Sequence, residues 1–246
     1  MNLKTATTTA MVILAAACGR NYDTRGMSLE QLEEIADQTF LDEDYNDASR
    51  LYTELMFTFP GSARMDFYYY RLGMSESGNR LWADALFYFD RVQNEFPRSQ
   101  WADDCSFQSA VVWWAQRHDF RKDLTPVINC RDQLESFFDR YPGSVLSEQA
   151  DDLMEDVDDY MARRALFTGL FYARRERFDA SLLYLREALN DYGETDCLAD
   201  VLIALGDVYA AKGNTFTARE FYQRAVDQCE LSSDQLDDVQ SKLGEL

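Results

Sequence analysis

The chain has 246 residues, 46% of them hydrophobic and 14% aromatic, so it can bury a large core. Its 11 glycines and 4 prolines are too few for a sheet-rich fold with many tight turns, which favours an all-helical protein. The formal charge of −20 argues against nucleic acid or an anionic membrane surface as a partner, because phosphate binding depends on Lys and Arg. We interpret the acidity as a well-solvated surface.

The first segment, residues 1–17, has the pattern of a signal peptide. Lys4 supplies a positive region, residues 10–17 are apolar, and small residues lead up to Cys18. This apolar stretch is too short to be a membrane helix, and no other apolar stretch in the sequence is longer. The pattern resembles a bacterial lipoprotein signal, which implies that Cys18 is lipidated, although Leu14 lies four residues before Cys18 rather than the usual three. A plain secretory signal is the alternative.

Residues 18–28 are expected to form a polar tether, and helical hairpins are expected from residue 29 onward. Ser28 and Gln31 match a capping box at the start of the first helix. Within residues 66–99 two amphipathic helices follow each other. Small Gly73 would let them touch beside Phe89, and Pro97 ends the second helix. This is the pattern of a tetratricopeptide (TPR) repeat, a helix-turn-helix unit of about 34 residues.

The same pattern of small and aromatic positions occurs five times. The matching residues are Ala36, Ala48 and Tyr52; Gly73, Ala85 and Phe89; Ala110, Cys130 and Leu134; Ala180 and Tyr184; and Gly206, Ala218 and Tyr222. The third copy is longer, with extra residues around His118 to Leu124 between its helices. The aromatic residues of its first helix are interpreted as packing rather than as a cofactor site.

Residues 145–175 contain no proline and only one glycine, with apolar residues at helical spacing, so they predict one long helix. It links repeats one to three (29–143) with a C-terminal part (144–246), and residues 141–144 are the expected boundary. Its carboxylates at 151–159 are expected to be a solvated face rather than a metal site, since no His or bent Gly loop accompanies them. A last amphipathic helix with Val239 should cap the array. The expected fold class is therefore all-α, a TPR-like right-handed α-solenoid of five helix-turn-helix repeats plus a C-terminal capping helix.

These features together resemble the BamD (YfiO-type) family of lipoproteins of the outer-membrane β-barrel assembly (BAM) machinery. The resemblance rests on the signal, the five repeats, the insertion ending in FFDRYPGS at 137–144, and LFYARR at 170–175. It implies a non-enzymatic adaptor, lipid-anchored on the periplasmic face of the outer membrane and touching the membrane only through that anchor. It also implies docking on a BamA-type barrel protein through the C-terminal half, and accessory BAM lipoproteins as further partners. The main basic patch, a candidate partner-binding site, is Arg163, Arg164, Arg174, Arg175 and Arg177.

The resemblance also implies that the N-terminal repeats bind unfolded barrel substrates. In TPR proteins the concave wall is lined mainly by the first helix of each unit. The candidate groove residues are Glu33, Asp37, Phe67, Tyr70, Met74, Phe107, Val111 and Trp114. The Lys and Asn residues that clamp acidic tails in other TPR domains are missing there. The groove should therefore prefer an extended segment that bears aromatic side chains, with Glu33 and Asp37 favouring a nearby positive charge. This suits the aromatic-ended C-terminal signal of outer-membrane barrels, which the resemblance also implies. The alternative is that the aromatic residues are simply core between repeats.

Catalysis has little support, and no cofactor is expected. His118 is the only histidine, and neither a phosphate-binding Gly loop nor a Cys-x-x-Cys motif is present. The alternatives to a barrel-assembly adaptor are another TPR lipoprotein that coordinates envelope or peptidoglycan machinery, and an enzyme that uses its acidic face.

Four cysteines besides Cys18 allow three pairings in an oxidising compartment. Antiparallel helices should bring Cys197 beside Cys229, so a disulfide between them is expected. A Cys105–Cys130 pairing is the weaker expectation, and buried free thiols are the alternative.

Overall fold

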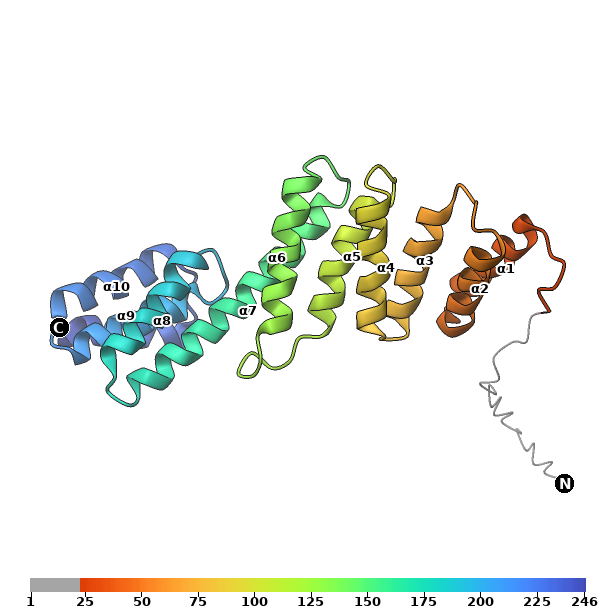
Figure 1. Cartoon of the computed structure of the whole chain (residues 1–246). Coiled ribbons are helices and arrows are strands. Elements are labelled where there is room, and N and C mark those ends of the chain that lie inside the picture. Colours follow the sequence, from red (N-terminus) through yellow and green to blue (C-terminus); the bar gives the residue numbers. More distant parts are fainter. Residues whose placement is uncertain (1–22) are drawn as a thin grey trace, which may run out of the picture.

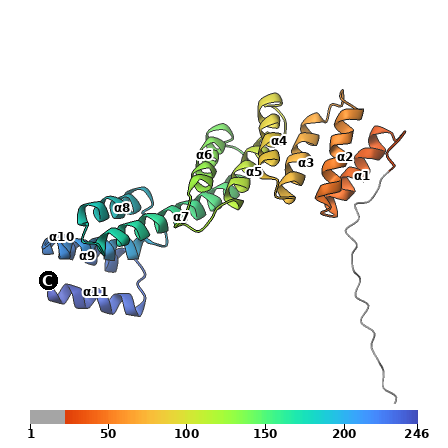
Figure 2. The ribbon, with the colours of Figure 1, turned by 60° about the horizontal axis from the view of Figure 1, so that its bottom comes forward.

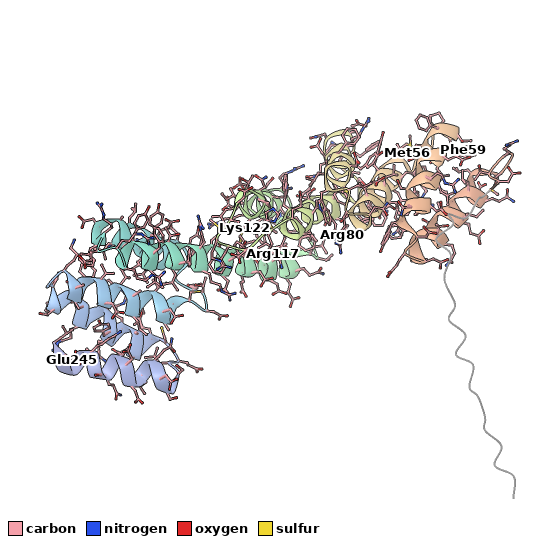
Figure 3. All side chains as sticks on the ribbon, turned by 90° about the horizontal axis from the view of Figure 1, so that it is seen from below. Met56, Phe59, Arg80, Arg117, Lys122 and Glu245 are labelled. Carbon is pink, nitrogen blue, oxygen red and sulfur yellow. The ribbon has the colours of Figure 1, made fainter. Side chains whose placement is uncertain are left out.

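The computed structural model describes residues 23–246, which form an extended row of helices without a strand (Figure 1). The signal segment and Cys18 lie outside these residues. The helices are α1 (Leu29–Leu41), α2 (Tyr45–Thr58), α3 (Met65–Gly78), α4 (Trp82–Glu95), α5 (Ala102–Ala115), α6 (Thr125–Arg140), α7 (Ser147–Ala173), α8 (Phe178–Asp191), α9 (Leu198–Ala211), α10 (Thr215–Gln228) and α11 (Ser233–Glu245). Figure 3 shows the row from below, with Phe59 near one end, Arg117 in the middle and Glu245 at the other end.

Consecutive helices pair into five hairpins, from α1–α2 to α9–α10, and α11 closes the C-terminal end (Figure 2). The expected TPR-like solenoid with a capping helix is thus confirmed. The capping box of Ser28 and Gln31 is present at the start of α1. The uninterrupted helix predicted over residues 145–175 is α7, which has 27 residues. Among the described residues, no helix combines the length and apolar character needed to cross a membrane.

In three of the hairpins a glycine of the first helix lies against a large side chain of the second, as two of them illustrate. Gly73 of α3 lies against the Phe89 ring of α4, and Gly206 of α9 lies against the Tyr222 ring of α10. A Cβ atom at either glycine would overlap the ring opposite. Phe89 is fully buried, so the ring has little room to give way. The close approach expected from the sequence is therefore real.

The turns inside four of the hairpins share one backbone geometry. Glu43, Arg80, Glu176 and Gly213 have φ values of 60°, 60°, 57° and 78°. In each turn the N–H of the following residue donates to a carbonyl of the preceding helix, as in Arg177 N–H to Tyr172 O at 3.0 Å. This is the left-handed helix ending that glycine accommodates best. The third hairpin lacks this turn because the insertion occupies its place.

Replacing Glu176 with glycine should stabilise the protein by about 0.5–1 kcal/mol. A left-handed conformation costs an L-residue roughly 1–2 kcal/mol, and the larger unfolded-state entropy of glycine offsets part of the gain. The matched control is Glu220→Gly, in the exposed interior of α10. That change should lower the free energy of unfolding by about 1 kcal/mol. Urea denaturation measures both, and a loss of stability in Glu176→Gly would show that this turn is not strained.

The hydrophobic core changes partners within α7 rather than at residues 141–144. Leu153 and Val157 pack with Phe137 in the cluster of repeat three. Ala162 and Ala165, farther along the same helix, pack with Leu185 and the C-terminal hairpins. Because one helix belongs to both cores, it joins the two parts of the solenoid without a flexible linker.

The insertion of repeat three packs against α7. The Phe120 ring meets Tyr160 and Phe167 edge-on, at centroid distances of 6.4 and 5.8 Å. Arg164 Nη1 donates to the Phe120 carbonyl at 3.2 Å, and the Tyr160 hydroxyl donates to the His118 carbonyl. These contacts hold the middle of α7 against the third hairpin.

Candidate functional site

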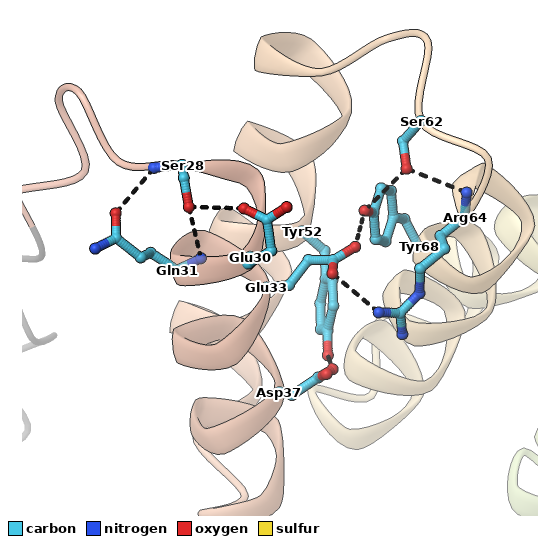
Figure 4. Close-up of polar contacts among 9 residues, drawn as sticks. All are labelled: Ser28, Glu30, Gln31, Glu33, Asp37, Tyr52, Ser62, Arg64 and Tyr68. Carbon is cyan, nitrogen blue, oxygen red and sulfur yellow. Dashed lines mark hydrogen bonds and ion pairs between the residues drawn. The ribbon is translucent and has the colours of Figure 1, made fainter.

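The two carboxylates expected in the N-terminal groove are engaged within the chain (Figure 4). Glu33 accepts from Arg64 at 2.9 Å and also from the Tyr68 hydroxyl. Asp37 accepts from the Tyr52 hydroxyl. Burial, together with the bond to Glu33, raises the pKa of Tyr68 to about 12. The expectation that these carboxylates attract a positive charge on a ligand needs correction, because they join α1 to α2 and α3 instead.

The predicted aromatic groove residues divide into core and surface. Phe67 and Phe107 are buried in two hydrophobic clusters, so for them the core interpretation is the right one. The partly exposed members are Tyr70, Met74, Val111 and Trp114. Tyr70 stacks on Trp101, with centroids 4.8 Å apart and an interplanar angle of 13°. Sequence reasoning did not assign Trp101 to the groove because it precedes α5 and lies outside the repeat template.

Trp114 lies near the end of α5, beside the insertion. Its ring meets Tyr160 edge-on at 5.8 Å, and the Arg117 guanidinium lies 4.1 Å from its centroid. An arginine over an indole face is a favourable cation–π arrangement. We call the partly exposed residues Tyr70, Met74, Trp101, Val111 and Trp114 the aromatic surface.

The five arginines expected to form one patch are separated into two groups. Arg163 pairs with Asp159 at 3.4 Å, and Arg164 is bonded to the insertion. Arg174, Arg175 and Arg177 lie around the turn between α7 and α8, roughly 15 Å farther along the helix axis. Only this second group is available to a partner as a cluster.

Exposed apolar side chains accompany the second arginine group. Leu170 and Phe171 are each 37% exposed at the end of α7. The Arg175 guanidinium lies 3.5 Å from the Phe171 ring centroid and also donates to the Phe171 carbonyl at 3.2 Å. We call Leu170, Phe171, Arg174, Arg175 and Arg177 the basic-apolar surface.

Acidic residues line a cavity of about 920 Å³ between α7 and the connection from α8 to α9. Its carboxylates are Asp152, Glu155, Asp156, Asp158, Asp159, Asp191, Glu194 and Asp196. Burial raises the pKa of Asp158, against the opposing effect of Arg131. Within residues 23–246, no group of three His, Cys, Asp or Glu side chains is placed to hold a metal ion. The cavity is therefore a negatively charged concave surface.

The expected disulfide between Cys197 and Cys229 is not present, because both residues are free thiols. Cys197 is buried just before the start of α9, where burial raises the pKa of its thiol and nearby Arg163 of α7 opposes that shift. Cys229 follows the end of α10. Cys105 and Cys130 are also free, and burial raises the pKa of Cys130 to about 12.

Several solved structures are similar to this chain at low identity. A thermophilic TPR protein, TTC0263 from Thermus thermophilus, is 18% identical with a TM-score of 0.39, covering 88% of this chain and 99% of that one. A TPR-repeat protein from Bacteroides fragilis is 12% identical with a TM-score of 0.49, covering 89% and 97%. MamA from Desulfovibrio magneticus RS-1 is 16% identical with a TM-score of 0.37, covering 81% and 93%.

No curated protein matches the sequence. A family model does match, over residues 25–224, which spans all five hairpins except the last residues of α10. The family is described as an outer membrane lipoprotein, in agreement with the lipoprotein-like start of the sequence. The chain therefore belongs to the YfiO family of outer membrane lipoproteins.

Proposed function

We propose that the protein is a non-enzymatic, lipid-anchored scaffold of the outer-membrane β-barrel assembly machinery, facing the periplasm. The observation that carries the proposal is the family match over residues 25–224. A continuous solenoid also supports it, since helical repeats present long surfaces to protein partners. In this role the protein binds a BamA-type barrel protein, accessory BAM lipoproteins and unfolded barrel substrates.

The basic-apolar surface is the proposed docking site for the folded barrel partner. On this surface the Arg175 guanidinium lies over the Phe171 ring. Aromatic and arginine side chains are enriched among the residues that contribute most to binding energy at interfaces. The aromatic surface is the proposed site for the unfolded substrate. Rings such as Tyr70 and Trp114 offer contact area to an extended segment at a low cost in side-chain entropy.

Co-purification after detergent extraction tests the proposed role. A large barrel protein carrying periplasmic POTRA domains should be recovered with the wild-type chain. Recovery of peptidoglycan-synthesis proteins without such a barrel would favour the alternative of another envelope-coordinating TPR lipoprotein. An activity that disappears with an acidic-face carboxylate would instead favour the enzyme alternative.

A pair of matched variants locates the docking site. Phe171→Ala with Arg175→Glu should abolish recovery of the barrel partner, because it removes a ring and reverses a charge on the basic-apolar surface. Phe216→Ala with Arg219→Glu changes an exposed ring and an exposed arginine on α10 and should leave recovery unchanged. If the barrel partner is recovered equally with both double variants, the basic-apolar surface is not its docking site.

Replacing Cys18 with serine should release the protein into the soluble periplasmic fraction. A single acyl chain attaches only marginally to a bilayer, whereas two chains anchor stably, so losing the lipidated cysteine removes the anchor. Cys229→Ser is the control, because this cysteine ends α10 and plays no part in the anchor, and it should stay with the membrane. Firm membrane retention of Cys18→Ser in cells that lack the barrel partner would refute the lipid anchor.

A further inference from the structure

Basic side chains gather along the edge of the solenoid that is formed by the turns inside the hairpins. Figure 1 shows the turns of α3–α4, α5–α6 and α7–α8 along its lower side. Arg80 lies in the first of these turns, and Arg117 and Lys122 lie in the insertion that forms the second. Figure 3 shows this side, with all three residues in the middle part of the row. The three cations thus belong to one edge.

These cations have no carboxylate partner within the described chain. Arg117 donates only to a carbonyl of its own hairpin, at 2.9 Å, while Arg80 and Lys122 make no side-chain hydrogen bond among the described residues. Asp119, whose charge Lys122 helps to stabilise, is already bonded by Arg121 at 2.8 and 2.6 Å. Since acidic residues outnumber basic ones 44 to 24, a cation that pairs with none of them is open to an anion from outside the chain.

The two edges of the solenoid differ in charge. The three arginines of the basic-apolar surface surround the α7–α8 turn, so they extend the same basic side. On the opposite edge, the α8–α9 connection carries Glu194 and Asp196 of the acidic cavity. The turn of the first hairpin, with three acidic residues at 42–44, is the exception on the basic side. The formal charge of −20 is therefore an average that does not describe this edge.

An exposed apolar side chain accompanies the cations. Leu81, next to Arg80, is 50% exposed. Surfaces that bind anionic bilayers combine these two kinds of side chain. The cations are attracted by the negative headgroups, and the apolar side chains enter the boundary between headgroups and acyl chains. We call Arg80, Leu81, Arg117 and Lys122 the basic edge.

The proposed lipid anchor does not by itself decide which edge faces the bilayer. A chain segment as long as residues 18–28 spans at most about 40 Å when fully extended. A helix of 14 residues, the length of α3, is about 21 Å long, so the tether allows either edge of the solenoid to reach the bilayer. Because an anchor also keeps lipid headgroups at a high local concentration, a modest attraction is enough to select one edge.

We propose that the basic edge lies against anionic phospholipid headgroups and sets the orientation of the anchored chain on the bilayer. The inference rests on the proposed lipid anchor, and it adds a second, charge-dependent contact that the composition of the whole chain argues against. In this orientation the acidic cavity faces away from the negative surface. A few cations give only a weak and reversible attachment, so the edge orients the chain without replacing the anchor.

Flotation with vesicles tests the basic edge in the Cys18→Ser chain, which lacks the anchor. Vesicles of phosphatidylcholine with about a quarter phosphatidylglycerol should bind this chain about tenfold more tightly than phosphatidylcholine alone, since each cation near an anionic surface adds to the attraction. Salt at about 0.5 M should remove the difference, because it screens charges at the surface.

Two double variants with the same change in net charge locate the contact. Arg80→Glu with Lys122→Glu should weaken binding to the anionic vesicles by about tenfold or more. Arg98→Glu with Arg219→Glu changes two exposed arginines outside the basic edge and should keep the affinity within about twofold. Equal losses in both pairs would show that net charge rather than this edge governs binding, and would overturn the proposal.

A polarity-sensitive fluorophore on an introduced cysteine tests the orientation of the lipid-anchored chain. The background is Cys229→Ser, because the other described cysteines are buried. Leu81→Cys places the label on the basic edge, and Val145→Cys places it on the opposite edge, at a side chain that is 91% exposed. On anionic vesicles the emission should shift to the blue at position 81 and stay unchanged at position 145. A shift at position 145 alone would contradict the proposed orientation.

Equal binding to both kinds of vesicle, or binding to neither, would overturn the proposal. Binding of a poly-glutamate peptide through Arg80 and Lys122, without binding to vesicles, would assign the basic edge to an acidic protein instead. Fractionation of cells that express Cys18→Ser tests the anchor separately. A chain that this substitution releases, yet that does not bind anionic vesicles, would keep the proposed anchor and lose only the role of the basic edge.

Discussion

Replacing Phe137 with alanine should lower the free energy of unfolding by about 3–5 kcal/mol, the usual cost of emptying a buried phenylalanine site. The side chain is fully buried. The centroid of its ring lies 6.1 Å from that of Phe107 and 5.9 Å from that of Tyr141. The same hydrophobic cluster contains Leu153 and Val157 of α7. The loss should therefore appear in urea denaturation as a large shift of the transition midpoint.

Phe57→Ala is the matched control for this substitution. Phe57 is 83% exposed at the end of α2, so its removal should change stability by less than about 0.5 kcal/mol. If both alanine variants lose the same stability, Phe137 does not occupy the core that joins repeat three to α7.

Replacing Gly73 with alanine should destabilise the protein by about 1–3 kcal/mol, because the added methyl group overlaps the buried Phe89 ring. Alanine is the better helix former by about 1 kcal/mol, so any loss of stability reports the overlap. Gly244 of α11 is the matched helical glycine, with open space where a Cβ atom would lie. Gly244→Ala should keep or slightly raise the stability.

A double-mutant cycle with Phe89→Leu separates the overlap from other effects. The smaller side chain leaves room for a methyl group at position 73, so the double variant should be more stable than the sum of the single losses implies. Strict additivity would mean that the α3–α4 hairpin does not depend on this contact.

The helical hairpins could be predicted because their signal is local. Pairs such as Gly73 with Phe89 recur in the sequence at the spacing of a TPR, and the structure brings these two residues together. The shared turn geometry could not be predicted. Three of its four left-handed residues are Glu43, Arg80 and Glu176, which carry no glycine signal.

The candidate site was predicted only in part, because contacts between helices decide it. Glu33 and Asp37 were identified from the repeat template, but nothing in that template shows that Tyr68 and Tyr52 direct their hydroxyls at them. The disulfide expectation failed for a related reason. Helix ends can be placed at similar heights from the sequence, whereas the neighbours of a cysteine side chain depend on its direction around the helix.

The position of the insertion was visible in the sequence, but its packing was not. Phe120 contacts Tyr160 and Phe167, which lie far from it in the sequence. Helical periodicity reports only local spacing, so it does not predict these contacts. Arg164 was assigned to a partner-binding patch from its charge, and in the structure it donates to the insertion instead. Charge alone thus does not separate a binding arginine from a structural one.

Site-specific photo-crosslinking in intact cells tests most directly the claim that the chain is a scaffold with two separate binding surfaces. A photoreactive phenylalanine analogue would replace Tyr70, Phe171 or, as the control, exposed Phe216. Position 171 is expected to crosslink to the barrel assembly partner and position 70 to newly made barrel substrates, with neither product at position 216. Crosslinks to the assembly partner at position 70 and none at position 171 would contradict it.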